Sequence, residues 1–156
     1  MQQATLCLLL DNNKILLGMK KKGFGSGKFN GFGGKVEAGE DIDAAAAREL
    51  WEESGVKVAK SDLVKHAVLT FLFPEAPKDK NWNQVVHVFV ARKWNGVPSE
   101  SDEMIPHWFS QEDIPFDNMW EDDAHWLPHV LEGKQVEGTF VFDKEGKISE
   151  KKMNVQ

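Results

Sequence analysis

The hydrophobic pattern of the chain begins with two apolar runs that predict a pair of adjacent strands. Residues 4–10 and 14–20 are rich in leucine and isoleucine, and the polar turn 11–13 separates them. Short apolar runs joined by such a turn are typical of a β-hairpin. The same reasoning predicts further strands at 63–73, at 85–94, at 107–109 and within 138–149.

Two segments have a helical pattern. Residues 41–54 contain strong helix formers, Asp41 can cap the first turn, and Gly55 follows where glycine is favoured. Residues 117–134 form the second segment, in which Pro128 must start, kink or end a helix. The glycine-rich stretch 20–35 is predicted to be a loop or an irregular strand. The polar stretches 74–83 and 95–106 are predicted to be loops, and the tail after residue 149 is expected to fray.

Strands and helices mixed in this order favour an α/β (α+β) fold in which a mixed β-sheet is sandwiched between helices. The chain has 156 residues and 41% hydrophobic content, so we expect one domain over residues 1–156 with a substantial core. No run is long enough to span a membrane, and the N-terminus lacks the features of a secretory signal.

The charge and cysteine content narrow the class of protein. The net charge of −6 argues against a nucleic-acid polymer as partner, because phosphate backbones attract basic surfaces. The single cysteine, Cys7, lies in an apolar run and excludes an internal disulfide framework. We therefore expect a cytoplasmic protein, acting as a monomer on a small molecule.

Acidic residues crowd the second half of the predicted 41–54 helix. Glu49, Glu52 and Glu53 fall within an arc of about 100° at helical spacing. Glu49 and Glu53 form a like-charge i,i+4 pair, which costs helix stability. A divalent cation would reverse that cost, and clustered carboxylates suit Mg²⁺ or Mn²⁺. The alternative is an ordinary solvated acidic face, which the composition alone would favour.

The spacing around this cluster argues for the metal site. Gly34 is followed after five residues by Glu40, and after seven more by the run "RELWEESGV" that ends at Val56. This pattern over residues 34–56 resembles the signature of the Nudix hydrolases at all nine specified positions. The resemblance implies a Nudix fold with a loop–helix–loop that binds Mg²⁺ and a diphosphate. Such enzymes cleave a nucleoside diphosphate linked to another moiety.

The resemblance also assigns roles to individual residues. It implies that the metal ligands are Glu49, Glu52, Glu53 and the carbonyl of Gly34. Arg48 would orient the carboxylates by ion pairing, and Glu40 would support the loop or bind a further ion. Glu52 and Glu53 are the candidates for the catalytic base, since a carboxylate not committed to metal can accept a proton from water. Glu103 is a further ligand or base candidate, although one acidic residue in an acidic loop is more often ordinary surface.

The similarity extends well beyond residues 34–56. The segments "LLGMKKKGFGSGKFNGFGGKVEAGE", "VHVF", "ESDEM" and "IPFDNMWEDDAHWLP" resemble the animal MutT homologues that hydrolyse oxidised purine nucleoside triphosphates. The implied reaction converts 8-oxo-dGTP or 2-hydroxy-dATP into the monophosphate and pyrophosphate. This reaction sanitises the nucleotide pool and prevents mutagenic incorporation into DNA.

The same resemblance implies a set of substrate contacts. The base-gripping positions are Asn30, Trp120, Asp122 and Asp123, the apolar walls are Phe24 and Phe71, and the minor contacts are Thr5 and Lys20. A purine requires an aromatic face and hydrogen-bonding groups at its edge, which this set supplies. Without the resemblance, Trp120 would be assigned to the core and the Asp pair to an exposed helix start. We also expect one pKa of the adjacent Asp pair to rise, so that the two share a proton.

Two departures from the mammalian members concern the pocket. The loop around 74–84 is several residues longer, and polar Gln84 falls near a position that is apolar in those proteins. These departures bear on the preference among oxidised bases and leave the reaction class unchanged. The glycine-rich stretch is not a P-loop, because Phe29 stands where a Ser or Thr must hold magnesium. Lys20 and its two neighbours either meet phosphate oxygens or form a solvated basic run.

Three other functions compete with this hypothesis. A Nudix hydrolase for ADP-ribose or a dinucleoside polyphosphate would not need the base-gripping set. A non-catalytic binding module should have lost metal ligands, whereas all three helix glutamates are present. An isoprenoid diphosphate isomerase would need a reactive cysteine, and Cys7 lies in an apolar strand.

Overall fold

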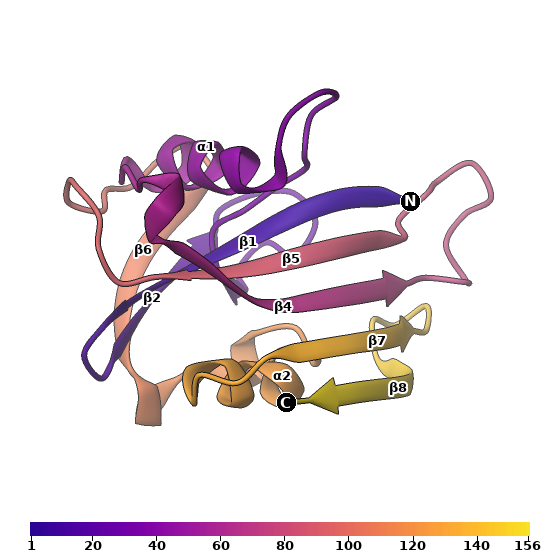
Figure 1. Cartoon of the computed structure of the whole chain (residues 1–156). Coiled ribbons are helices and arrows are strands. Elements are labelled where there is room, and N and C mark those ends of the chain that lie inside the picture. Colours follow the sequence, from indigo (N-terminus) through magenta and orange to yellow (C-terminus); the bar gives the residue numbers. More distant parts are fainter.

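The computed structural model describes all 156 residues and contains one mixed eight-stranded sheet with a helix on each face (Figure 1). The strands are β1 (Gln2–Asp11), β2 (Lys14–Lys20), β3 (Phe29–Asn30), β4 (Leu63–Leu72), β5 (Gln84–Ala91), β6 (Met104–Ser110), β7 (Val136–Phe142) and β8 (Ile148–Val155). The helices are α1 (Ile42–Ser54) and α2 (Asp123–Leu131). The strand order is β3-β2-β1-β5-β4-β7-β8, and β6 pairs with β2. Strands β1 and β5 run parallel, as do β4 and β7, and the other pairs are antiparallel.

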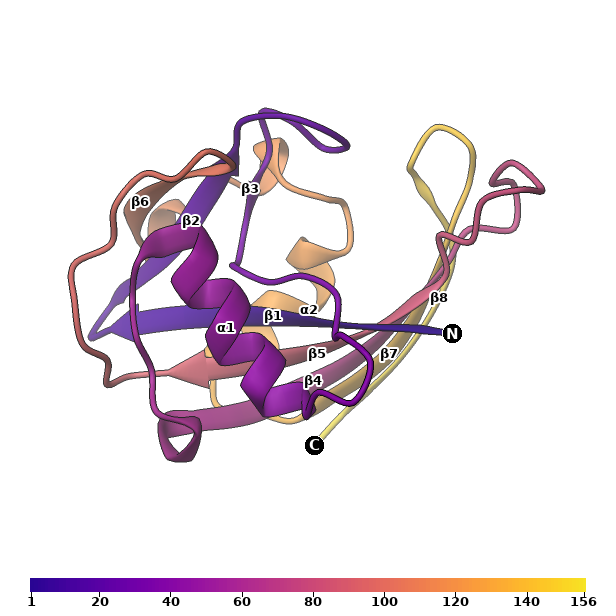
Figure 2. The ribbon, with the colours of Figure 1, turned by 90° about the horizontal axis from the view of Figure 1, so that it is seen from above.

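Strand β1 shows why both faces of the sheet are covered. Leu8 and Leu10 pack into a cluster that includes Trp126 of α2, whereas Cys7 and Leu9 pack into a second cluster with Leu50 of α1. Alternate side chains of a strand point to opposite faces, so a continuous apolar run requires a partner on each side. The expected mixed sheet between helices is confirmed, and Figure 2 shows α1 lying across the strands.

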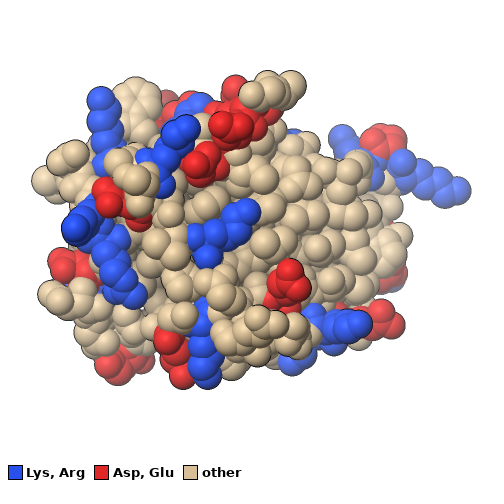
Figure 3. Space-filling view, in the orientation of Figure 1, with Lys and Arg blue, Asp and Glu red and all other residues tan.

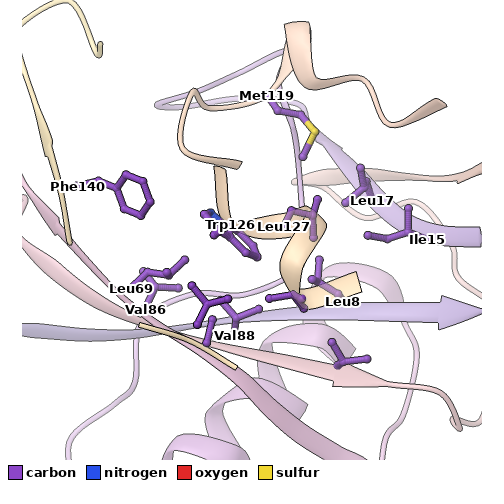
Figure 4. Packing of buried hydrophobic residues seen from close by; sticks show 14 of the residues in the cluster. Leu8, Ile15, Leu17, Leu69, Val86, Val88, Met119, Trp126, Leu127 and Phe140 are labelled. Atoms are coloured by element: carbon purple, nitrogen blue, oxygen red, sulfur yellow. The ribbon is translucent and has the colours of Figure 1, made fainter. Parts of the chain in front are cut away.

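Helix α2 supplies much of the larger core cluster. Trp126 and Leu127 are buried and face Leu69, Val86 and Leu8 of the sheet (Figure 4). Pro128 lies inside this helix, which ends three residues later at Leu131. A proline there removes one backbone donor, and the packing of its buried neighbours keeps the short helix in place.

Strands β1 and β2 pair only near their connecting turn and then separate. Leu9, Leu10 and Asp11 pair with β2, whereas the far end of β2 pairs with β3. The chain that follows β3 runs along β1 instead, with bridges from Cys7 to Phe32 and from Ala4 to Lys35. This arrangement lays the glycine-rich segment against β1 and beside α1.

Gly33 and Gly34 are needed for this close approach. A Cβ at Gly33 would lie 1.8 Å from the Thr5 carbonyl oxygen, and one at Gly34 would lie 2.5 Å from the carboxyl carbon of Glu49. The first distance excludes any side chain without movement of the backbone. Glycine at both positions therefore brings the loop against the sheet on one side and against α1 on the other.

The structure differs from the sequence prediction in several elements. The tail does not fray but forms β8, with Ile148, Met153 and Val155 packed against the core. The second helix is shorter than residues 117–134, and β6 begins at Met104, earlier than predicted. Asp41 stands at the N-cap of α1, but its side chain makes no capping hydrogen bond. Gly55 ends α1 in the left-handed conformation, as predicted.

The surface carries charges of both signs. Figure 3 shows them interspersed over the face drawn there, without a continuous stripe of basic side chains. Neither helix combines the length and apolarity needed to cross a bilayer.

Candidate active site

One cavity of about 670 Å³ collects almost every residue that the sequence marked as functional. Its lining includes Thr5, Lys20, Phe24, Asn30, Gly34, Glu49, Glu52, Glu53, Phe71, Glu103, Trp120, Asp122 and Asp123. Arg48 does not line this cavity. Side chains from α1, the glycine-rich loop, the sheet and the segment before α2 thus share one space, whose volume is typical of a small-molecule site.

Arg48 lies behind the acidic side of the cavity and holds it together. Its Nε donates to Glu40 at 2.7 Å, its Nη1 donates to Glu49 at 2.8 Å, and Nη1 also lies 3.3 Å from Glu52. Its Nη2 donates to the Lys35 carbonyl oxygen at 3.1 Å, which ties α1 to the preceding loop. One guanidinium therefore offsets the repulsion among several carboxylates.

Glu53 is held separately, on the glycine side of the cavity. Its Oε1 accepts a hydrogen bond from the Gly33 backbone N–H at 2.9 Å. Burial raises the pKa of Glu53 to about 8 against the effect of this bond, and the charges of Glu49 and Glu103 act in the same direction as burial. Burial also raises the pKa of Glu49, although Arg48 opposes the shift. Glu40, by contrast, has a pKa lowered to about 2, chiefly by its hydrogen bond from Arg48.

The acidic cluster has the donor chemistry of a divalent metal site. Carboxylate oxygens are hard ligands, and burying like charges together is unfavourable without a counter-ion. As they stand, no three of these carboxylates converge closely enough to hold one ion, because Arg48 and Gly33 engage Glu49 and Glu53. The Gly34 carbonyl oxygen accepts hydrogen bonds from the Thr5 N–H at 2.8 Å and from the Thr5 hydroxyl at 3.5 Å. The residues fit a hard cation, and binding it requires rotation of the glutamate side chains.

The other part of the cavity is aromatic and contains the Asp pair. Asp122 and Asp123 are both buried, and Asp122 accepts a hydrogen bond from Trp126 Nε1 at 2.8 Å. Burial raises the pKa of Asp122 to about 6 and that of Asp123 well above its ordinary value. The charge of Asp122 raises the pKa of Asp123 further, whereas Lys28 lowers it. The pair is therefore not an exposed helix start, and burial favours the protonated form of both carboxyl groups.

Trp120 precedes this pair in the chain, and its ring lies against the glycine-rich loop. Lys28 Nζ lies 5.3 Å from the centre of the Trp120 ring, and a Cβ at Gly25 would lie 3.0 Å from that ring. Of the three lysines 20–22, Lys20 lines the cavity, whereas Lys21 pairs with Glu100 at 2.6 Å. The basic run is thus divided between the cavity and the surface.

Several lining residues were not identified from the sequence as site residues. Six of them are the large apolar residues Phe73, Trp126, Phe142, Leu69, Met104 and Val86, which the sequence pattern marks only as core or strand positions. Lys35 and Gly33 also line the cavity and were not identified. The spacing of Asp122 and Trp126 could have predicted their hydrogen bond, because residues four apart in a helical segment lie on the same face.

Comparison with known proteins gives a consistent result. The model of the NUDIX domain matches residues 1–130. An oxidized purine nucleoside triphosphate hydrolase of Mus musculus is 45% identical over 144 residues, which are 92% of this chain and 88% of that protein. The Danio rerio protein of the same description is 45% identical over 150 residues, which are 96% and 92% of the two chains. The crystal structure of a mutator MutT protein from Bacillus halodurans superposes with a TM-score of 0.84 at 25% identity, covering 99% of this chain and 98% of that one.

The raised pKa of Asp123 predicts how its replacement changes stability with pH. The folded state holds this proton more tightly than the unfolded state, so the wild-type stability falls as pH rises above the unfolded pKa of about 3.8. Asp123→Asn removes the titrating group. We expect its Tm relative to wild type to increase by about 5 °C between pH 5 and pH 8.

Thermal unfolding of both proteins across this pH range measures the effect, with exposed Asp117→Asn as the matched control. An Asp123→Asn difference in Tm that stays constant, or that shrinks as pH rises, would contradict the protonated state of the pair.

Proposed function

This chain belongs to the NUDIX domain family, and we propose that it hydrolyses oxidised purine nucleoside triphosphates to the monophosphate and pyrophosphate in this cavity. The 45% identity to two oxidized purine nucleoside triphosphate hydrolases over nearly the whole chain supports this reaction. Nudix hydrolases act on small nucleotide substrates and generally use divalent metal ions. For this chain we propose Mg²⁺, with Mn²⁺ as a substitute.

The observation that carries the proposal is the continuity of the cavity. Glu49, Glu52, Glu53 and Glu103 line the same space as Trp120 and the Asp pair. The glutamates can bind the metal ion that accompanies a triphosphate, and Trp120 with the Asp pair can bind a purine base. A nucleotide therefore has a place for its charged end and a place for its base within one site.

On the acidic side, the chain positions the groups that surround the triphosphate. A bound Mg²⁺ would neutralise phosphate charge and make water a better nucleophile. Arg48 pairs with Glu49 and Glu52 and thereby keeps both carboxylates on this side of the cavity. Glu52 and Glu53 are our candidates for accepting the proton of the attacking water, and Lys20 faces the phosphates.

On the base side, the Asp pair supplies a donor and an acceptor. A protonated carboxyl donates a hydrogen bond, whereas an ionised one only accepts. Moving the proton from one Asp to the other exchanges the two positions, which suits the edge of an oxidised guanine in one arrangement and that of an oxidised adenine in the other. Asn30 adds a further donor and acceptor, and Trp120 stacks on the base.

The reaction is tested by a hydrolysis panel with product analysis. We expect 8-oxo-dGTP and 2-hydroxy-dATP to yield monophosphate and pyrophosphate with higher kcat/KM than dGTP, dATP, ADP-ribose or a dinucleoside polyphosphate. Chelation should abolish turnover, and added Mg²⁺ should restore it. Preference for ADP-ribose, or release of orthophosphate in place of pyrophosphate, would contradict the proposal.

The catalytic assignment is tested by removing one carboxylate charge at constant shape. We expect Glu53→Gln to lower kcat by roughly two to four decades while the fold stays intact, because a proton-accepting or metal-binding group is lost. Glu52→Gln is measured beside it, and Glu150→Gln on exposed β8 is the control. Near-wild-type turnover in both Glu52→Gln and Glu53→Gln would show that neither residue has the proposed role.

The shared proton is tested by replacing each acid with an amide. A fixed amide cannot exchange roles with its neighbour, so Asp122→Asn and Asp123→Asn should each change the ratio of kcat/KM on 8-oxo-dGTP to that on 2-hydroxy-dATP. We expect a change of about tenfold, the effect of one misplaced hydrogen bond. The ratio is measured from pH 6 to pH 9. A ratio that keeps its wild-type value throughout would limit the pair to a structural role.

A further inference from the structure

Two aromatic side chains meet at the rim of the cavity although both are exposed. Phe24, in the β2–β3 connection, is 66% exposed, and Trp82, in the β4–β5 connection, is 43% exposed. Their ring centres lie 5.8 Å apart at an angle of 34°. In Figure 2 the two connections leave different parts of the sheet and both project toward the top of the view. Because both rings are exposed, their contact is not part of the hydrophobic core and can have a role at the rim of the cavity.

Trp82 lies behind the cavity wall. Phe24, Phe73 and Trp120 line the cavity, and Trp82 does not. The Trp82 ring contacts the outer side of two of these wall residues, because its centre is 5.8 Å from that of Phe24 and 6.0 Å from that of Phe73. Phe24 in turn lies 5.1 Å from Trp120, the proposed stacking residue. The rings form a row that runs from Trp120 through Phe24 to Trp82 and Phe73.

The β4–β5 connection holds Trp82 in a defined place. The Asn83 side chain accepts the Phe73 backbone N–H at 2.7 Å and thereby closes the neck of this connection. A turn between Pro77 and Lys80 folds its outer part, and Glu75 accepts the Lys144 N–H of the β7–β8 turn at 3.2 Å. Trp82 is therefore carried by a segment that is anchored at both its base and its outer part.

The segment that carries Phe24 is closed by backbone hydrogen bonds, from the Gly27 N–H to the Lys20 carbonyl oxygen at 2.8 Å and from the Ser26 N–H to the Gly23 carbonyl oxygen at 3.1 Å. Gly23, Gly25 and Gly27 have positive φ, a conformation that glycine adopts without strain. The rings in contact with Phe24 are those of Trp120, which lines the cavity, and Trp82, which does not. Because the Phe24 side chain is 66% exposed, these two aromatic contacts are the ones that hold its ring over the cavity.

We propose that Trp82 is a positioning residue for the base, acting by holding Phe24 against Trp120. This inference rests on the proposed function, since it assigns the aromatic side of the same cavity to the base. Trp82 contacts the wall and not the acidic cluster, so it contributes to binding equally in the ground state and the transition state. Its removal should raise KM and leave kcat unchanged. The wall acts through aromatic contact, so both oxidised purines should be affected alike.

The experiment compares Trp82→Ala, Trp82→Phe and Trp108→Ala with wild type. Trp108 is a matched control, because it is 39% exposed and stacks on Trp94 at 5.9 Å without lining the cavity. We expect Trp82→Ala to raise KM for 8-oxo-dGTP and 2-hydroxy-dATP about three- to tenfold at unchanged kcat. Trp82→Phe should return KM to within about twofold of wild type, and Trp108→Ala should leave it unchanged.

A double-mutant cycle with Phe24→Ala tests whether Trp82 acts through Phe24. If it does, the double variant has the KM of Phe24→Ala alone, because the link is already lost. An unchanged KM in Trp82→Ala, a fall in kcat in place of a rise in KM, or multiplication of the two single effects would overturn the inference. Failure of the wild-type enzyme to hydrolyse either oxidised triphosphate would instead overturn the proposed function, so the two failures are distinct.

Discussion

The acidic side of the site depends on one guanidinium. Arg48 contacts Glu40, Glu49 and Glu52 together with the Lys35 carbonyl, so it joins α1 to the loop before it and offsets repulsion among the carboxylates. Glu40 keeps a strongly lowered pKa in this arrangement, and therefore the ion pair persists across the neutral range. Arg48 does not contact Glu53, and burial raises the pKa of Glu53 to about 8. Without an ion-pair partner, the ionised form of this buried carboxyl is therefore unfavourable. The cluster is thus partly neutralised by the protein and leaves the remaining charge to a cation.

The geometry of the sheet brings this cluster to the base side of the cavity. Separation of β1 from β2 admits the segment after β3, and Gly33 and Gly34 allow that segment to touch both Thr5 and Glu49. The Gly33 N–H then reaches Glu53, while Asn30 at the start of the same segment lines the cavity. A side chain at Gly33 would collide with the backbone of Thr5, so the loop can pack this closely against the sheet only with glycine there. The close packing in turn fixes the position of the Gly33 N–H that binds Glu53.

Elements and site residues could be predicted from the sequence where residues of one chemical type recur at a spacing typical of a helix, a strand or a motif. The pattern over residues 34–56 led to the acidic cluster, apolar runs led to the central strands, and helix-forming residues followed by Gly55 led to α1. Strand β8 was missed because its core contacts come from Ile148, Met153 and Val155, spaced too widely among charged residues for a clear pattern. Phe73 and Phe142 were missed as lining residues because an aromatic at a strand end looks the same whether it faces the core or a cavity. The contact between Phe24 and Trp82 joins two loops far apart in sequence, and no local pattern encodes it.

The two sides of the cavity differ in how they are encoded along the chain. The acidic side comes mainly from the continuous stretch 34–53, whereas the aromatic side is assembled from the β2–β3, β4–β5 and β7–β8 regions and the segment before α2. Surface connections accept substitutions and changes of length more readily than helices packed in a core. Mutation can therefore reshape base recognition piecemeal in descendants of this protein while the hydrolytic machinery is inherited intact. A division of this kind lets one ancestral reaction diversify into enzymes that guard against different damaged nucleotides.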